Sequence, residues 1–255
     1  MKPQKTPLLE YDPDPNAIID PIKIHPPCGA PRDCIICFFN KEIERLRDVN
    51  NLVKIVDISC EMGPNYIYKF EIKGKEIAIF QPGVGAALAG GNLDAAIASG
   101  CRRFIAIGSS GVLESSIPRG TLFVPTSAVR DEGTSFHYLP PSRETQPHPG
   151  AVERLKTSLL QFKVPIRECK TWTTDAFFRE TPKKIKMRRA EGCLTVDMEA
   201  SAFFAIAKYR GVEFAQLLYG GDDVSGEEWN ARGWNKLHDL RHKMFEIATE
   251  ACLQD

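Results

Sequence analysis

Residues 83–108 read GVGAALAGGNLDAAIASGCRRFIAIG and hold a turn, a helix and a strand in one run. Two glycines lead into a stretch of small residues, Ala86–Ser99, which favours a helix that packs closely. The apolar segment Arg103–Gly108 then has the composition of a buried strand. Buried strands that alternate with helices predict an α/β domain.

The same alternation extends outward on both sides of this stretch. The sequence predicts these further elements: strand Cys34–Phe39, a helix through Ile43 and Leu46, a hairpin of Tyr66–Ile72 and Glu76–Gln81, strand Thr121–Val124, a loop over 131–142, helix Val152–Phe162, strand Ile166–Thr171, a polar loop, strand Leu194–Val196, helix Glu199–Tyr209, strand Phe214–Tyr219 and helix Trp234–Cys252. We therefore expect one three-layer α/β/α domain over residues 34–255, with a central mixed, largely parallel sheet.

The first 33 residues differ in composition from the rest of the chain. They contain eight prolines and show little hydrophobic periodicity, so we expect an extended arm over residues 1–33. An arm of this kind is suited to drape over a neighbouring subunit.

Charge and cysteine content narrow the class of protein. Lys plus Arg and Asp plus Glu both total 33, which gives no signature for nucleic acid or an anionic membrane. A small molecule is the expected partner, and the lack of a long apolar run or signal-peptide pattern predicts a cytoplasmic protein. The eight cysteines are scattered, and the pair Cys34 and Cys37 lacks a second pair to complete a zinc site. Most of the cysteines are expected to be buried thiols, and no metal is expected.

Open α/β sheets bind ligands at strand ends, and four segments meet that description. They are Gly83–Gly85, Gly108–Gly111, Thr173–Thr181 and Gly220–Ser225. The segment Gly108–Gly111 has the composition of an anion-binding loop or of a tight turn. Because Gly83–Gly85 lacks the third glycine of a dinucleotide fingerprint, a nicotinamide site is not expected.

An acid follows the strand end in Thr195–Ser201, which reads TVDMEAS. Glu199 lies in the expected first helical turn, where the helix dipole favours a negative charge. A carboxylate fixed there can accept two hydrogen bonds from the vicinal hydroxyls of a sugar. The alternative is an ordinary acid at a helix start.

Five ordered segments together resemble the nucleoside phosphorylase superfamily, which includes purine nucleoside and uridine phosphorylases and the methylthioadenosine/adenosylhomocysteine nucleosidases. The segments are Gly83–Gly85, Ile107–Gly111, Thr174–Phe178, Val196–Ala200 and Gly221–Asp223. The resemblance covers the chain from about Cys34 to its C-terminus. Residues 129–138 also look like the corresponding loop of uridine phosphorylases.

The resemblance implies a role for each matching position. Met198 and Glu199 would bind the ribose, Phe177 would stack on the base, Phe178 would close the base pocket, Asp222 would protonate the leaving base, and Gly85, Gly108 and Ser109 would line the site of phosphate or attacking water. Breaking a glycosidic C–N bond builds negative charge on the base, so a proton donor beside the base fits this chemistry.

The nucleophile is left open between phosphate and water. Phosphorylases hold phosphate with arginines, whereas this chain has Phe38–Lys41, Ala106 and Gly63 near those positions. The segment Ile35–Ile43 instead resembles the nucleosidases, in which an acid at the position of Glu42 positions the attacking water; its alternative reading is a solvated helix acid.

The leading interpretation is a nucleoside phosphorylase that uses phosphate as co-substrate and no cofactor, in a homo-oligomer of two or more subunits. The alternatives are a nucleoside hydrolase and a non-catalytic nucleoside-binding or storage protein of the same fold. Asp222 favours a purine, while the loop Glu132–Tyr138 and the position of Thr181 look more like the uridine enzymes.

Overall fold

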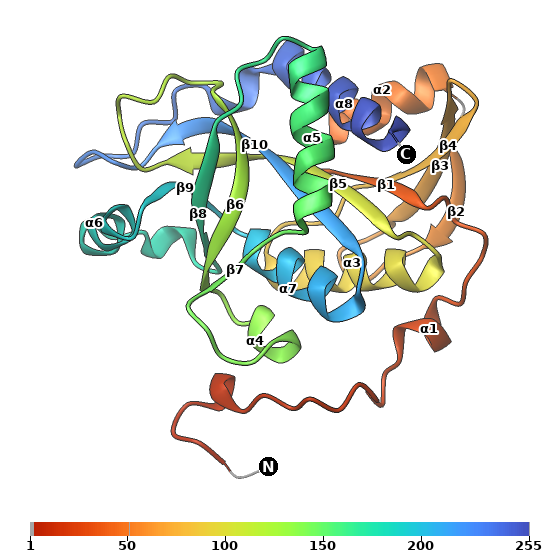
Figure 1. Cartoon of the computed structure of the whole chain (residues 1–255), viewed down its shortest axis with the longest axis horizontal. Coiled ribbons are helices and arrows are strands. Elements are labelled where there is room, and N and C mark those ends of the chain that lie inside the picture. The colour runs from red at the N-terminus through yellow and green to blue at the C-terminus, as the bar shows by residue number, and fades with distance from the viewer. Residues whose placement is uncertain (1–2, 51, 255) are drawn as a thin grey trace.

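A computed structural model of the chain describes residues 3–50 and 52–254 (Figure 1). Its strands are β1 (Asp33–Cys37), β2 (Val53–Asp57), β3 (Tyr66–Ile72), β4 (Lys75–Phe80), β5 (Arg103–Val112), β6 (Leu122–Asp131), β7 (Glu144–Thr145), β8 (Glu168–Thr174), β9 (Cys193–Asp197) and β10 (Glu213–Asp223). Its α-helices are α1 (Pro21–Ile24), α2 (Asn40–Asn50), α3 (Ala86–Ser99), α4 (Ser135–Tyr138), α5 (Pro149–Gln161), α6 (Pro182–Ala190), α7 (Ala200–Arg210) and α8 (His238–Leu253), with short 3₁₀ turns η1 (Pro7–Leu9), η2 (Phe177–Arg179) and η3 (Trp234–Lys236).

The strands form one mixed sheet in the order β10-β6-β8-β9-β5-β1-β4-β3-β2, with β7 paired to β6. Strand β5 also pairs with β10, so β5, β10, β6, β8 and β9 close into a ring. β5 runs parallel to both β1 and β10 but antiparallel to β9. Strand ends from β5, β9 and β10 are therefore neighbours.

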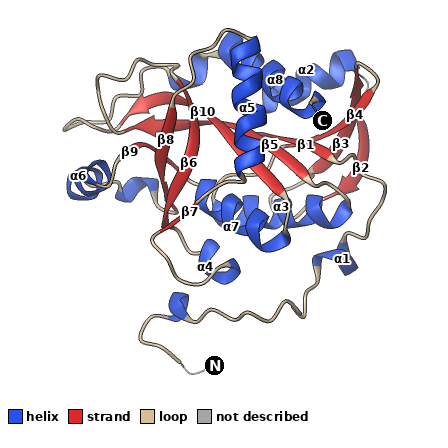
Figure 2. Ribbon diagram, viewed as in Figure 1, coloured by secondary structure: helices blue, strands red, loops and turns tan. Residues whose placement is uncertain are grey.

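Helices cover both faces of the sheet, α3 and α7 on one and α2, α5 and α8 on the other (Figures 1 and 2). Strand β1 shows how the sequence produces these layers, because its side chains alternate between two apolar clusters. Ile35 and Cys37 join the cluster beneath α5 and α8, whereas Cys34 and Ile36 join the one beneath α3 and α7. Both cysteines thus pack in the core on opposite faces of the strand.

The expected single α/β domain with a mixed sheet is confirmed, and helix α3 has the predicted bounds. The hairpin is also confirmed. Lys73 and Gly74 both have positive φ angles, 51° and 76°. Positive φ at both central positions is the geometry of the tight two-residue turn whose twist matches the strands.

Several predicted boundaries are wrong. Gly108–Gly111 is not a loop, and of Gly220–Ser225 only Val224 and Ser225 lie beyond a strand, because β5 continues to Val112 and β10 to Asp223. The end of β5 pairs with both β10 and β9, and the end of β10 pairs with β5, so these glycine-rich ends stay extended. The polar loop after β8 contains helix α6, which begins with Thr181 as its cap and Pro182 in its first turn, a known start signal. The loop over 131–142 contains α4.

The described part of the arm, residues 3–32, runs along the molecule past α4, α7 and α3 (Figure 1). It contains η1 and α1 and has exposed apolar side chains, including Ile18 and Ile19. Strand β1 begins at Asp33, one residue before the predicted start of the domain. The role of the arm in contacting a second subunit stays a prediction.

Candidate active site

Strand β9 ends in a buried carboxylate that the sequence prediction did not assign. Asp197 Oδ1 accepts hydrogen bonds from the hydroxyls of Thr171 and Thr173, each at 3.0 Å. Its Oδ2 accepts from the backbone N–H groups of Glu199 and Ala200, at 2.9 and 2.6 Å. Burial raises the pKa of Asp197, and these hydrogen bonds oppose the rise. Asp197 therefore caps α7 and fixes the backbone that carries Glu199, and an aspartate just before a helix start is the sequence signal for it.

Glu199 lies at the start of α7, one residue before the helix, with 7% of its surface exposed. Its Oε1 accepts a hydrogen bond from the backbone N–H of Gly85 at 2.6 Å. Burial, and next the charge of Asp197, raise the pKa of Glu199 to about 8. The structure thus brings together two of the predicted segments, which lie 114 residues apart in the chain. Met198, beside Glu199, is half-buried.

Gly85 supplies that N–H in a conformation suited to glycine. Its φ is +93°, and it immediately precedes α3. A side chain is strained in this region of φ, whereas glycine adopts it readily. The glycine is therefore part of the means by which the loop after β4 reaches the Glu199 carboxylate.

Asp222 lies near the end of β10, next to the end of β5. Its carboxylate oxygens are 3.6 and 3.7 Å from the position that a Cβ would take on Gly111. Gly111 in turn pairs with Val196 of β9. Asp222 and the β9–α7 corner that carries Glu199 therefore flank the same end of β5.

A second acid, Glu180, lies near Asp222 and was not predicted as a site residue. Burial, and next the charge of Asp222, raise the pKa of Glu180 to about 7. It follows η2, which holds Phe177 and Phe178. Their rings contact each other with centroids 4.0 Å apart, and they are 50% and 88% exposed. Stacking on a base stays a prediction for both.

The segment expected to hold phosphate or water is part of strand β5. Ser109 is half-buried, while the hydroxyl of Ser110 donates to the backbone oxygen of Tyr219 at 3.3 Å. Gly108 is covered by Phe38, whose Cδ2 lies 3.2 Å from where a Cβ would stand. Because the strand is paired with β10, it does not form the separate glycine loop that the sequence predicted.

Glu42 is buried in the first turn of α2, and its Oε2 lies against nitrogen atoms of two side chains. Arg45 Nε and His242 Nδ1 each lie 3.1 Å from it. His242 belongs to α8, so this carboxylate links α2 to α8. Among the hydrogen bonds of the described residues, none joins Glu42 to Ser109 or Glu199.

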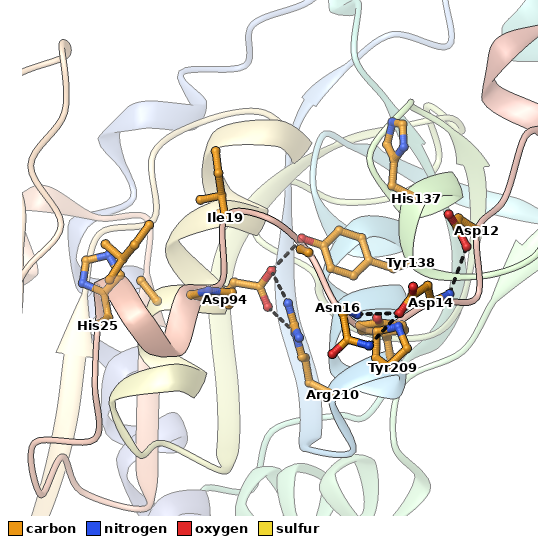
Figure 3. A pocket seen from close by; sticks show the side chains of 16 residues that line it. Asp12, Asp14, Asn16, Ile19, His25, Asp94, His137, Tyr138, Tyr209 and Arg210 are labelled. Atoms are coloured by element: carbon orange, nitrogen blue, oxygen red, sulfur yellow. Dashed lines mark hydrogen bonds and ion pairs between the residues drawn. The ribbon is translucent and has the colours of Figure 1, made fainter.

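A hollow of about 530 Å³ lies elsewhere, between the arm and helices α3, α4 and α7 (Figure 3). At its base Asp94 accepts hydrogen bonds from Arg210 Nε at 2.8 Å and from the Tyr138 hydroxyl at 2.6 Å. Asp94 is thus fully engaged in holding α3, α4 and α7 together. None of the predicted site residues lines this hollow.

The described residues, 3–50 and 52–254, contain no group of three or more His, Cys, Asp or Glu side chains placed to hold a metal ion. No helix in them is both long and apolar enough to cross a membrane.

Comparison with known proteins assigns the class. The family model for the phosphorylase superfamily matches residues 32–252, and the chain therefore belongs to that superfamily. A guanosine phosphorylase from Halorubrum lacusprofundi is 24% identical over 209 residues, covering 80% of this chain and 87% of that protein. A purine nucleoside phosphorylase of the DeoD type from Bacillus cytotoxicus is 24% identical over 190 residues, covering 71% of this chain and 77% of that protein.

Proposed function

We propose that the chain cleaves the N-glycosidic bond of a purine nucleoside with phosphate, giving free base and ribose 1-phosphate. The observation that carries this proposal is the placement of two carboxyl groups around the end of β5. Glu199 lies on the β9–α7 side, and Asp222 lies on the β10 side against Gly111. A nucleoside has a sugar and a base that need different carboxyl chemistry, and this arrangement offers one group to each.

Glu199 is suited to the ribose. Its position is fixed by the N–H of Gly85, and a carboxylate has further acceptor sites for the 2′- and 3′-hydroxyls. As the glycosidic bond breaks, the ribose gains positive charge, which a nearby negative charge stabilises. Burial and the charge of Asp197 disfavour the ionised form of Glu199, and hydroxyl donors of a bound ribose would stabilise that form.

Asp222 is suited to the base. A carboxyl that delivers a proton to the purine prevents the build-up of negative charge on the leaving group. Nearby Glu180 holds a proton up to about pH 7 and supplies a second acid at the same edge. A purine, rather than uracil, is the base that the names of the relatives also support.

Phosphate as the acceptor is supported by the family and by the names of the relatives. In this chain Gly85, Gly108 and Ser109 would line its site. Hydrolysis is the second candidate, because Phe38 packs against Gly108 and α2 begins with the buried acid Glu42. Both features disfavour a doubly charged anion beside β5.

The proposal includes no cofactor beyond phosphate, a homo-oligomeric assembly and a cytoplasmic location. The proline-rich arm with exposed isoleucines supports an assembly. The eight cysteines are all free, as expected in a reducing compartment.

The test is incubation of the purified chain with guanosine, inosine, adenosine and uridine, with and without phosphate, followed by chromatography of bases and sugars. Release of a purine together with ribose 1-phosphate, only when phosphate is present, supports the proposal. Free ribose at the same rate in phosphate-free buffer would establish hydrolysis instead. No release from any nucleoside, despite binding, would favour a non-catalytic nucleoside-binding protein.

A second test is the variant Glu199→Ala, which keeps the hydrogen bonds from the backbone at the start of α7 to Asp197. Losing charge-assisted hydrogen bonds to the ribose should cost about 2–4 kcal/mol of transition-state binding, or roughly 30-fold to 1000-fold in rate. Unchanged activity in a folded Glu199→Ala variant would remove Glu199 from the site.

A further inference from the structure

Two adjacent acids at the end of β10, Asp222 and Asp223, have different hydrogen-bond partners in the loop that follows. Asp223 Oδ1 accepts from the N–H and the hydroxyl of Ser225, at 2.8 and 2.6 Å. The backbone of Asp223 also exchanges two hydrogen bonds with Asn230, at 2.8 and 3.0 Å. Asp223 therefore closes a tight loop over residues 223–230, and its carboxylate is used in that structure.

This closed loop brings Trp229 back to Asp222. The indole Nε1–H of Trp229 donates a hydrogen bond to Asp222 Oδ2 at 2.7 Å. That distance is at the short end for an N–H donor. Trp229 is 64% exposed, so its side chain does not fill the core. Its indole N–H is instead used in the hydrogen bond to Asp222.

The chemistry of the indole selects between the two oxygens of Asp222. An indole N–H is only a donor, whereas a protonated carboxyl has one oxygen that carries the hydrogen and one that accepts. The carbonyl oxygen of a protonated carboxyl is the better acceptor, so the indole N–H on Oδ2 favours Oδ1 as the oxygen that carries a proton.

We propose that Trp229 is a positioning residue that fixes the Asp222 carboxyl group through Oδ2 and leaves Oδ1 to carry the proton that is delivered to the leaving base. This inference rests on the proposed N-glycosidic cleavage, and it adds a residue that acts through Asp222 without contacting the reacting atoms. On proton transfer, the O–H bond of Oδ1 breaks, a base nitrogen gains the hydrogen, and Asp222 is left as a carboxylate. The indole hydrogen bond then stabilises that negative charge.

The first test measures the contact without any activity. Protein labelled with ¹⁵N at the indole nitrogens of its three tryptophans gives three indole resonances, and Trp229→Phe assigns the one of interest. Asp222→Ala should shift the Trp229 resonance upfield because the hydrogen bond from the indole N–H to the Asp222 carboxyl group is lost. An unmoved resonance overturns the proposal whether or not the protein is an enzyme.

The second test measures the consequence for proton delivery. Trp229→Phe keeps an aromatic ring and removes the N–H, and it should lower kcat/KM for guanosine roughly 10-fold to 100-fold. For 7-methylguanosine, whose base leaves without needing a proton, the change should be less than about 3-fold. Adding Trp229→Phe to Asp222→Ala should cause no further loss, since the partner is already absent.

Trp234→Phe is the matched control, because Trp234 lies on η3 beside Gly221 and its indole is not the donor to Asp222. Any loss that it causes should be the same for both substrates. Equal losses on both substrates in Trp229→Phe would show a merely structural role and overturn the proposal. If the unsubstituted protein releases no base at all, the proposed function fails, while the indole resonance still tells whether the contact exists.

Discussion

The burial of the Glu199 carboxyl group predicts how the stability of the protein depends on pH, and this prediction does not depend on the substrate. Replacing Glu199 by Gln keeps the shape of the side chain and an oxygen that accepts the N–H of Gly85. Gln cannot ionise, so no charge appears at this position, where only 7% of the residue is exposed. We expect the Glu199→Gln variant to be more stable than the unsubstituted protein at high pH. At low pH this advantage in stability should be much smaller.

The raised pKa of Glu199 determines the direction in which stability changes with pH. Burial shifts it from the ordinary 4.5 to about 8, so the folded protein holds the proton more tightly than the unfolded chain. The stability linked to this proton is fully present below pH 4.5 and is lost as the pH rises toward 8. Since each pKa unit corresponds to about 1.4 kcal/mol, the loss between pH 6 and pH 9 is on the order of 3 kcal/mol.

The assay is thermal unfolding of both proteins at about pH 6 and about pH 9, at one protein concentration and without nucleoside or phosphate. For a chain of this length, roughly 3 kcal/mol corresponds to about 5–10 °C in Tm, so the advantage of Glu199→Gln should grow by that amount. Glu228→Gln, which removes an exposed carboxyl, is the control and should change Tm equally little at both pH values. An advantage of Glu199→Gln that is the same at both pH values would refute the reasoning.

Two further predictions concern the base side of the site and the packing of α3 on α7. Because burial and the charge of Asp222 raise the pKa of Glu180 to about 7, Glu180→Gln should remove a transition near pH 7 from the pH profile of base release; a transition that persists assigns it to another group. Gly90→Ala places a Cβ 2.8 Å from Ile206 Cδ1 and should lower the free energy of unfolding in urea by about 1–2 kcal/mol. Gly91→Ala, one residue along the helix in open space, should raise it by about 0.5–1 kcal/mol, and equal effects at the two positions would contradict the packing argument.

Sequence reasoning succeeded where a local pattern is enough to determine the structure. Helix α3 has the predicted bounds because Gly85 and Gly100 flank a run of small residues on both sides. Glu199 was placed correctly at a helix start because an apolar strand precedes it and helical spacing follows. Such signals lie within a few residues of the feature that they predict.

It failed where partners distant in the chain decide the outcome. The glycines at Gly108 and Gly220 have the composition of loops, yet both lie in strands because β5 and β10 pair with each other along that stretch. No local pattern records a pairing between segments about 110 residues apart. Trp229 was missed for a related reason, since its contact with Asp222 depends on how the loop closes between Asp223 and Asn230.

Asp197 and Glu199, two residues apart between β9 and α7, have different roles. Asp197 receives four protein donors, from two threonine hydroxyls and two backbone N–H groups, which match the roughly four acceptor sites of a carboxylate. It is therefore saturated and serves to hold the backbone. Glu199 receives the Gly85 N–H on Oε1 and retains capacity to accept hydroxyl groups from a ligand. Burial raises the pKa of both groups, so the free acceptor capacity of Glu199 is what makes it, rather than Asp197, the carboxyl group suited to bind a sugar.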